Sequence, residues 1–265
     1  MPKVRVNDIE MNYELHGEGE PLVLIMGFTG NLEGWRPLLP AFAREYRVLI
    51  FDNRGAGLTD KPAGPYSIPM MADDAAGLMD ALGIESANVY GMSMGGMIAQ
   101  ELTLRHPQKV KALVLGCTTP GGPNSHPRPK KTIEALTRIP NVSREEGLEI
   151  ALRLLFTEEF IAANGPQVRE TTRNAFDLRL PRHAVLAQAG AIAAHDTYDR
   201  LPQIKVRTLV IAGGSDEMIL SANSPILAQR IPGAELVMYP KARHGYLYEV
   251  AAEAMAAVLD FLRRH

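Results

Sequence analysis

Two kinds of hydrophobic patterning alternate along the chain and predict two kinds of element. Short, nearly continuous apolar runs are typical of strands that are buried on both faces. Between these runs, apolar residues lie three or four positions apart, which predicts helices. The predicted strands are 22–26, 47–52, 87–90, 111–116, 206–212 and 235–239, and residues 3–6 and 9–15 predict a β-hairpin. Strands alternating with helices indicate an α/β fold with a mostly parallel sheet flanked by helices.

The pattern changes in the middle of the chain. No strand is predicted between residues 118 and 201, where a Pro- and Gly-rich irregular stretch precedes several helical segments. These helices are predicted at about 131–137, 144–156, 165–176 and 181–195, and those outside this region at about 35–42, 70–82, 222–230 and 246–263. We therefore expect an α/β core formed by 1–117 and 202–265, with 118–201 inserted as a helical cap.

One short motif joins a predicted strand to a predicted helix. Residues 91–96 read Gly-Met-Ser-Met-Gly-Gly, directly after the apolar run 87–90 and before a helical pattern that ends near Pro107. Glycines two residues before and after a serine permit a sharp turn that holds the serine hydroxyl out at the end of the strand. A chance match in a chain with 23 glycines is the alternative. The flanking strand and helix favour Ser93 as a nucleophile.

A serine nucleophile needs a histidine to accept its proton and a carboxylate to orient that histidine. Asp216 follows the predicted strand 206–212, and His244 follows the strand 235–239. Because the carboxyl ends of parallel strands meet at one edge of the sheet, we expect these side chains to lie near Ser93. The chain order Ser, Asp, His is also the one that this strand-turn-helix arrangement favours.

Other residues remain as alternatives to these partners. Glu217 is adjacent to Asp216, and Asp196 and Asp199 are not far away in the sequence. The remaining histidines, interpreted as helix caps or as turn, loop or surface groups, are His16, His106, His126, His183, His195 and His265. A substrate contact stays open for His183 and His195, which lie in the predicted cap helices.

Acyl transfer also requires hydrogen-bond donors for the oxyanion. In this architecture they are the backbone N–H of the residue after the nucleophile and one from an early strand-to-helix loop. The first is Met94, and the loop is Gly27-Phe28-Thr29-Gly30, from which we expect the Phe28 N–H to donate. A plain glycine-rich turn is the alternative interpretation of that loop.

Composition narrows the choice of partners. The 265 residues carry a net charge of −2, which gives no indication of nucleic acid or a membrane surface as a partner. No apolar run is long enough to span a bilayer, and the N-terminus lacks the apolar core of a signal peptide. The single cysteine, Cys117, excludes an internal disulfide and fits a reducing cytoplasm, where we expect the protein to be. No local spacing predicts a metal or dinucleotide site, and the oligomeric state is not predicted.

These motifs together resemble those of the α/β-hydrolase superfamily over essentially the whole chain. They are residues 91–96, Asp52 to Gly57, Gly213-Gly214-Ser215-Asp216 and His244-Gly245. Residues 80–84 and 106–114 resemble the esterase, 3-oxoadipate enol-lactonase and non-haem peroxidase-like group. The resemblance implies an eight-stranded sheet, a cap between strands 6 and 7 that forms the substrate pocket, and no cofactor.

The chain departs from the pattern of this family at two places. Met26 stands where the family usually has the histidine of a His-Gly pair, so contacts around the oxyanion loop must differ. The proline that often follows the acid is replaced by residues 217–220. Ser93 in place of an aspartate argues against the haloalkane dehalogenase and epoxide hydrolase branches, which need a carboxylate nucleophile.

The sequence thus predicts a serine hydrolase that cleaves a small-molecule carboxylic ester. Residues expected at the substrate pocket, with plain core packing as the alternative, are Gly27, Trp35, Met92, Leu154, Leu155 and Phe156. Enol-lactone hydrolysis, C–C bond hydrolysis and perhydrolysis by the same site stay open. So does a different class of protein, a small-molecule receptor that retains the triad but barely turns over.

Overall fold

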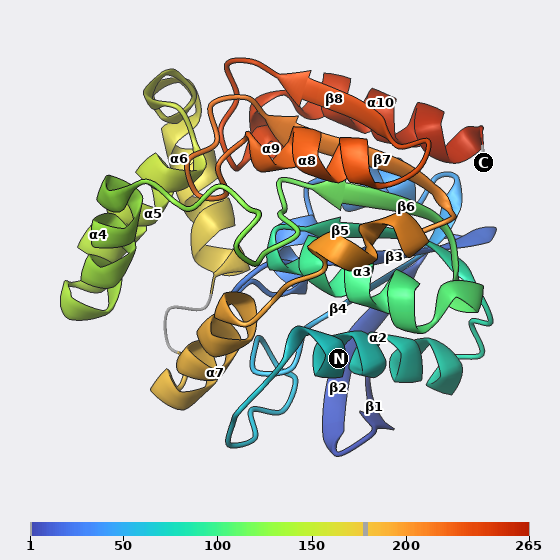
Figure 1. Cartoon of the computed structure of the whole chain (residues 1–265). Coiled ribbons are helices and arrows are strands. Elements are labelled where there is room, and N and C mark those ends of the chain that lie inside the picture. Colours follow the sequence, from blue (N-terminus) through green and yellow to red (C-terminus); the bar gives the residue numbers. More distant parts are fainter. Residues whose placement is uncertain (1, 177–179, 265) are drawn as a thin grey trace.

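The computed structural model describes residues 2–176 and 180–264 and contains an eight-stranded sheet (Figure 1). Its strands are β1 (Lys3–Val6), β2 (Ile9–His16), β3 (Glu20–Ile25), β4 (Tyr46–Phe51), β5 (Ala87–Met92), β6 (Val110–Gly116), β7 (Arg207–Gly213) and β8 (Glu235–Tyr239). They are ordered β1-β2-β4-β3-β5-β6-β7-β8. Strands β3 to β8 pair in parallel, and β1 and β2 form an antiparallel edge. The predicted hairpin and mostly parallel sheet are confirmed.

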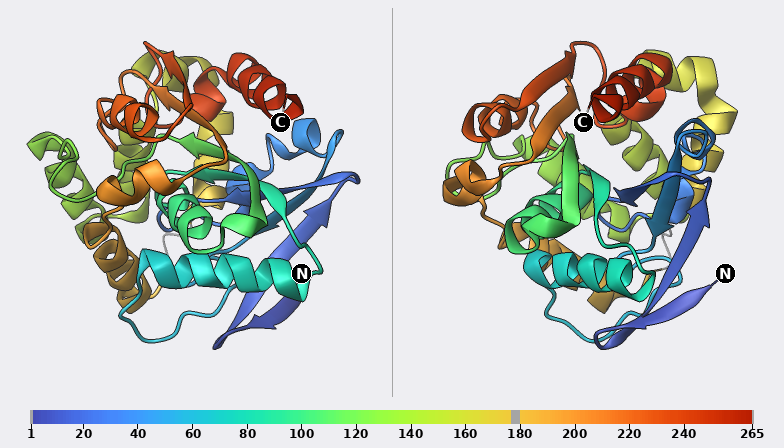
Figure 2. Two further views of the ribbon diagram at one scale, coloured as in Figure 1. Left: turned by 45° about the vertical axis from the view of Figure 1, so that its right-hand side comes forward. Right: turned by 90° about the vertical axis from the view of Figure 1, so that its right-hand side faces the viewer.

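Helices cover both faces of this sheet (Figures 1 and 2). One face is packed by α2 (Ile68–Ala81), α3 (Met94–Arg105) and α8 (Asn223–Arg230). The other is packed by α1 (Leu39–Phe42), α9 (Tyr246–Glu249) and α10 (Ala251–Arg263). Short 3₁₀ helices complete the set: η1 (Leu32–Trp35), η2 (Pro107–Lys109), η3 (Ile139–Asn141) and η4 (Tyr198–Gln203).

Alternation within the apolar runs explains why both faces are covered. In β3, Val23 and Ile25 belong to the core beneath α2 and α3, whereas Leu22 and Leu24 belong to the core on the opposite face. Side chains of successive strand residues point to opposite faces, so a continuous apolar run supplies both cores at once. The other central strands divide their residues in the same way.

Four helices lie between β6 and β7 and form the cap, at the left of Figure 1: α4 (Lys130–Arg138), α5 (Arg144–Leu155), α6 (Glu158–Ala175) and α7 (Arg182–Ala193). The cap has an apolar cluster of its own, whose buried members are Leu148, Leu152, Leu155, Phe156 and Val168. The helices occur where they were predicted to within a few residues, except for the start of α6. Residues 177–179, inside the predicted cap, lie outside the described part of the chain.

Three predicted helices differ in the structure. Helix α6 begins at Glu158 rather than near Gly165, because Thr157 caps its N-terminus and the helix continues past Pro166 through a kink at Asn164. The predicted helix 246–263 is interrupted at Val250, which leaves the helical region and separates α9 from α10. The predicted helix 35–42 consists of the end of η1 and the single turn α1.

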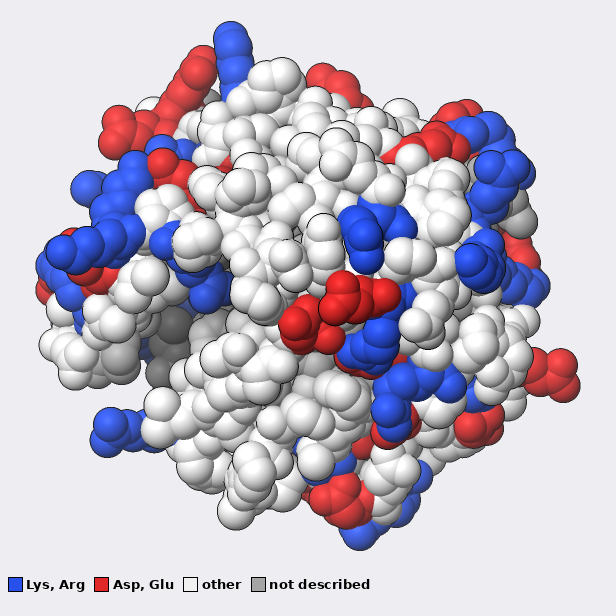
Figure 3. Space-filling view, in the orientation of Figure 1, with Lys and Arg blue, Asp and Glu red and all other residues white. Residues whose placement is uncertain are grey.

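Charged side chains are spread over the face of the molecule that Figure 3 shows. Lysine and arginine side chains are interspersed with aspartate and glutamate on the face shown in Figure 3, without a large patch of one sign. Among the described helices, none has the length and apolar character needed to cross a bilayer.

The close crossing of β3, β5 and α3 should make the stability of the protein sensitive to a side chain at Gly95. A Cβ at Gly95 would lie 2.0 Å from the carbonyl oxygen of Ile25, so Gly95→Ala forces strand and helix apart. We expect a loss of about 3 kcal/mol or more in the free energy of unfolding, measured by urea titration. Gly190→Ala in α7 is the matched control, because a Cβ there meets nothing within 4 Å. Removing a helix-interior glycine should raise stability by roughly 0.5 to 1 kcal/mol. Equal stability of the two variants would contradict the prediction.

Candidate active site

The residue between β5 and α3 has a strained backbone. Ser93 has φ 59° and ψ −120°, a conformation that non-glycine residues rarely adopt. The glycines on either side of it permit the tight crossing, since a Cβ at Gly91 would lie 2.2 Å from the carbonyl oxygen of Gly95. Loop residue Gly27 lies directly against this turn, where its Cβ would be 3.0 Å from the Ser93 Cβ. The predicted turn and its neighbouring loop are therefore adjacent in space.

Hydrogen bonds hold Ser93 in this conformation from two sides. Its N–H donates to the carbonyl oxygen of Gly116 at 2.8 Å, and its own carbonyl accepts from Thr118 Oγ1 at 2.7 Å. The first turn of α3 adds a bond from the Gly96 N–H to the same carbonyl at 2.9 Å. Because the end of β6 and the start of α3 both bind the Ser93 backbone, the surrounding structure maintains the strained conformation of Ser93.

Asp216 and His244 form a buried pair at the ends of β7 and β8. Asp216 Oδ2 lies 2.7 Å from His244 Nδ1, and the two residues are 1% and 4% exposed. The other oxygen, Oδ1, accepts from the backbone N–H groups of Met218 and Ile219 at 2.8 and 3.1 Å. These hydrogen bonds fix the carboxylate, which in turn fixes the imidazole through Nδ1. The other ring nitrogen, Nε2, therefore points away from Asp216.

The alternative acids lie elsewhere. Glu217 forms an ion pair with Lys131 at 2.7 Å. Asp196 accepts from the backbone N–H of Tyr198 at 3.1 Å, and the Asp199 side chain is exposed. Of the three acids near Asp216 in the sequence, none contacts His244 among the described residues.

Most of the other histidines also have local partners. His16 contacts Glu14 at 2.7 Å, His106 contacts Asp73 at 2.8 Å, and His183 contacts the carbonyl oxygen of Lys61 at 2.9 Å. His126 is exposed, and His265 lies outside the described residues. Burial lowers the pKa of His195 to about 4, and neither of its ring nitrogens has a hydrogen-bond partner in the described structure.

The charge state of His244 depends on opposing influences. Burial by itself lowers the pKa of His244, but the negative charge of Asp216 and the contact with Cys117 outweigh it and raise the pKa to about 10. The second ring nitrogen, Nε2, lies 3.9 Å from Cys117 Sγ. Among the described residues Nε2 has no other hydrogen-bond partner, so no hydrogen bond connects it to the Ser93 hydroxyl. Such bonds are often long before substrate binds.

The cap contacts the loop that carries His244. The Gly245 N–H donates to the carbonyl oxygen of Leu155 at 2.7 Å, and a Cβ on Gly245 would overlap the Phe156 ring. The Glu249 carboxylate accepts from the N–H groups of Thr157 in the cap and Arg243 in the histidine loop, at 2.6 and 2.5 Å. The position of the imidazole is therefore tied to the position of α5 and α6.

Two backbone N–H groups near Ser93 have no hydrogen-bond acceptor among the described residues. Neither Phe28 nor Met94 donates its N–H to another described residue, while the N–H of Thr29 is engaged by Gln188 Oε1 at 2.9 Å. Met94 is the first residue of α3, where N–H groups lack acceptors inside the helix. These are the two donors that the sequence predicts for an oxyanion.

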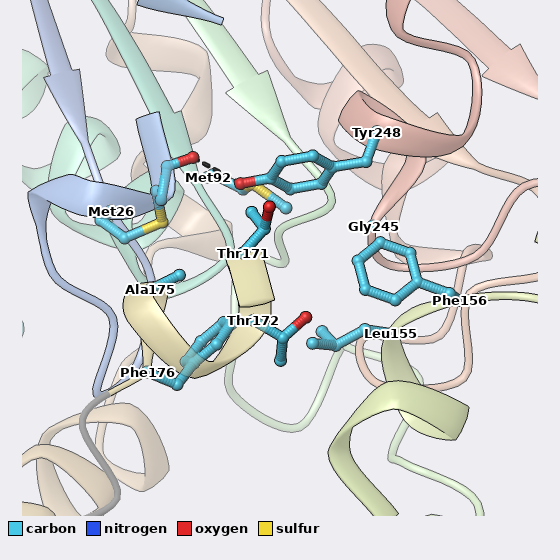
Figure 4. A pocket seen from close by; sticks show the side chains of 11 residues that line it. Met26, Met92, Leu155, Phe156, Thr171, Thr172, Ala175, Phe176, Gly245 and Tyr248 are labelled. Carbon is cyan, nitrogen blue, oxygen red and sulfur yellow. Dashed lines mark hydrogen bonds between the residues drawn. The ribbon is translucent and has the colours of Figure 1, made fainter. Parts of the chain in front are cut away.

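A small cavity of about 30 Å³ separates the cap from the core (Figure 4). It is much smaller than the roughly 300 to 1,000 Å³ of ligand pockets. Its lining side chains come from the ends of β3, β5 and α5, from α6 and from α9, and are mostly apolar: Met26, Met92, Leu155, Phe156, Thr171, Thr172, Ala175, Phe176 and Tyr248, with Gly34 and Gly245. The Tyr248 hydroxyl donates to the Gly34 carbonyl oxygen across it.

The residues predicted for the pocket divide into two groups. Met92, Leu155 and Phe156 line this cavity, and Gly27 lies against Ser93. Trp35 and Leu154 are not among the lining residues. Trp35 is fully buried in the core, with its ring 5.3 Å from that of Tyr90 between centroids. The structure thus places Trp35 in the packing between η1 and the sheet, the alternative weighed for it.

Comparison with known proteins agrees with this geometry. The family model described as alpha/beta hydrolase fold matches residues 20–249, which include the whole candidate triad. The chain belongs to the α/β-hydrolase fold family. Family membership supports hydrolase activity for this α/β hydrolase and leaves the bond that it cleaves undetermined.

Relatives of this α/β hydrolase carry names with different carbonyl chemistries. A protein of Azorhizobium caulinodans named "Putative carbamate hydrolase RutD" is 31% identical over 247 residues, 93% of this chain and 92% of that one. The crystal structure of an enol-lactonase from Burkholderia xenovorans LB400 has a TM-score of 0.87 and 31% identity, covering 99% of this chain and all of the other. An esterase from Thermogutta terrifontis has a TM-score of 0.84 and 28% identity, with 100% and 99% covered.

Sequence reasoning missed a cap residue that reaches the oxyanion loop. Gln188 of α7 is fully buried, and its amide joins the Thr29 N–H to the carbonyl oxygen of Arg54, at 2.9 and 2.7 Å. No local pattern marks it, because its partners are more than 130 residues away. The only available signal is a polar residue at a position where the helix faces the core.

Removal of the Gln188 amide should affect stability. Gln188→Ala leaves the Thr29 N–H and the Arg54 carbonyl without partners, which should lower the free energy of unfolding by about 1 to 3 kcal/mol in a urea titration. Gln167→Ala, at an exposed position of α6, is the matched control and should change stability by less than about 0.5 kcal/mol. A Gln188 variant as stable as this control would contradict the assignment.

Proposed function

We propose that this α/β hydrolase is a serine hydrolase that cleaves a carboxylic ester through an acyl-enzyme. Ser93 attacks the ester carbonyl, His244 accepts the serine proton and then donates it to the departing alcohol, and Asp216 orients the imidazole. Water, deprotonated by His244, releases the acid. The observation that carries the proposal is the buried Asp216–His244 pair beside a serine with a positive φ.

The backbone around Ser93 supports the oxyanion part of the mechanism. Tetrahedral intermediates need preorganised donors that are not already engaged. The N–H groups of Phe28 and Met94 meet that requirement, because neither donates to another described residue. The Met26 side chain, in place of the usual histidine, lines the cavity next to this loop. In our proposal the cap shifts to admit the substrate, since the cavity of about 30 Å³ is smaller than an ester of ordinary size.

The names of two similar proteins suggest two related classes of substrate. The Azorhizobium relative carries the name of a carbamate hydrolase, and the Burkholderia structure is that of an enol-lactonase, which opens a cyclic ester. The same triad attacks all three carbonyls, and they differ in the group that leaves and in its protonation by His244. An open-chain ester, a lactone and a carbamate assayed side by side distinguish these substrates by kcat/KM.

Loss of the nucleophile is the direct test. Ser93→Ala should lower kcat for a short-chain activated ester by at least about a thousandfold, because the remaining groups cannot form the acyl-enzyme. Ser86→Ala, in the connection that precedes β5, removes a serine hydroxyl away from the proposed triad and should retain wild-type kcat. Wild-type turnover by Ser93→Ala would falsify the proposal. Stoichiometric ligand binding with negligible turnover across the panel would instead favour a receptor.

The pH dependence of the reaction tests the state of His244. A general base must be neutral, and the pKa of this imidazole is raised above its ordinary value of 6.5. The hydrolysis rate should therefore increase as pH rises, with the acid limb of kcat/KM centred above pH 6.5. Asp216→Asn removes a charge that raises the pKa, so the limb should move to lower pH while kcat falls by about 10³ to 10⁴. An acid limb at or below pH 6.5 in the wild type is the contrary result.

A further inference from the structure

A thiol lies against the proposed catalytic histidine. Cys117 Sγ is 3.9 Å from His244 Nε2, and ligand atoms of Cys117, His244 and Asp216 all lie within 4.8 Å of one another. All three residues are buried, with Cys117 only 1% exposed. Thiolate, imidazole and carboxylate are the side-chain ligands that zinc prefers. The cluster therefore has the chemistry of a metal site.

The backbone holds this thiol in place. Cys117 has φ 36°, a left-handed conformation, and its N–H donates to the carbonyl oxygen of Ile211 at 2.9 Å. The residues before and after it, Gly116 and Thr118, both hydrogen-bond the backbone of Ser93. Because both sides of Cys117 are fixed, the sulfur stays beside the imidazole without the loss of flexibility that a mobile ligand would incur.

The distances fit a zinc ion with little movement. Zinc lies about 2.3 Å from a thiolate and about 2.0 Å from an imidazole nitrogen, which at a tetrahedral angle separates these ligands by about 3.6 Å. The separation of 3.9 Å between Sγ and Nε2 is a few tenths of an ångström larger. Asp216 already accepts at His244 Nδ1, the carboxylate–histidine arrangement that orients metal-binding imidazoles.

We propose that Cys117 and His244 form an inhibitory zinc site. Zn²⁺ binds to His244 Nε2 and Cys117 Sγ, the thiol and the protonated imidazole each release one proton to solvent, and water completes the coordination. The ion is an inhibitor and takes no part in the reaction. It occupies the lone pair that would accept the Ser93 proton, so zinc and turnover exclude each other. The inhibitory role rests on the serine-hydrolase proposal above, whereas the binding site itself does not.

Cobalt binding tests the site independently of activity. Co²⁺ substitutes for zinc, and a thiolate ligand gives a near-ultraviolet charge-transfer band. Cys117 is the single cysteine of the chain, so such a band in untagged protein can arise only from this thiol. We expect the band to appear with one equivalent of Co²⁺, to disappear on addition of Zn²⁺, and to be absent in Cys117→Ser. Absence of the band in the wild type would overturn the proposal.

Inhibition by zinc provides the second measurement. Zinc should inhibit the wild type, and the inhibition constant should be at least about tenfold weaker in Cys117→Ser, each rate being compared with the same variant without zinc. His126→Asn removes an exposed histidine outside the cluster and should leave the inhibition constant unchanged. Equal inhibition of the wild type and Cys117→Ser would overturn the assignment to this thiol.

A further variant keeps the test independent of protein folding and of the serine-hydrolase proposal. If Cys117→Ser does not fold, His244→Gln retains the thiol and removes the imidazole, so its cobalt band should require at least about tenfold more metal. An undiminished cobalt affinity in His244→Gln would exclude His244 as a ligand. If no ester, lactone or carbamate is hydrolysed, the serine-hydrolase proposal fails while the cobalt titrations still decide the metal site.

Discussion

The rest of the structure depends on the close crossing of β3, β5 and α3. At Gly95 the helix backbone lies so near the Ile25 carbonyl that no side chain fits, and Gly91 meets Gly95 in the same way. This crossing forces Ser93 into a positive φ and leaves the Met94 N–H at the free end of a helix. The parallel sheet then brings the ends of β7 and β8, with their carboxylate and imidazole, to the same edge.

The cap is coupled to this edge by partly buried polar contacts. Gln188 reaches the loop beneath the cap, and Glu249 joins the histidine loop to the start of α6. A cap movement that enlarges the small cavity would therefore act on the loops that carry Phe28 and His244. The same hydrogen bonds therefore join the cap to both loops that the proposed mechanism uses.

Local patterns predicted the core better than they predicted the cap. Each buried strand reads as an apolar run because it must supply two cores, and the glycines around Ser93 mark a turn that few other residues permit. In the cap, a helix was predicted to begin near Gly165, yet α6 begins at Glu158 and continues through a kink at Asn164. Trp35 had the character of a pocket residue but packs against Tyr90. Tertiary contacts outweighed local preference in both cases.

The sequence by itself determined the α/β architecture, the sharp turn at Ser93 and the positions of Asp216 and His244 at strand ends. These features follow from periodicity and backbone sterics, which act over a few residues. Only the tertiary structure decided that Asp216 rather than Glu217 contacts His244, that Gln188 binds the Thr29 loop, and that Cys117 lies against the imidazole. Those contacts join residues 28 to 159 positions apart, so no local pattern records them.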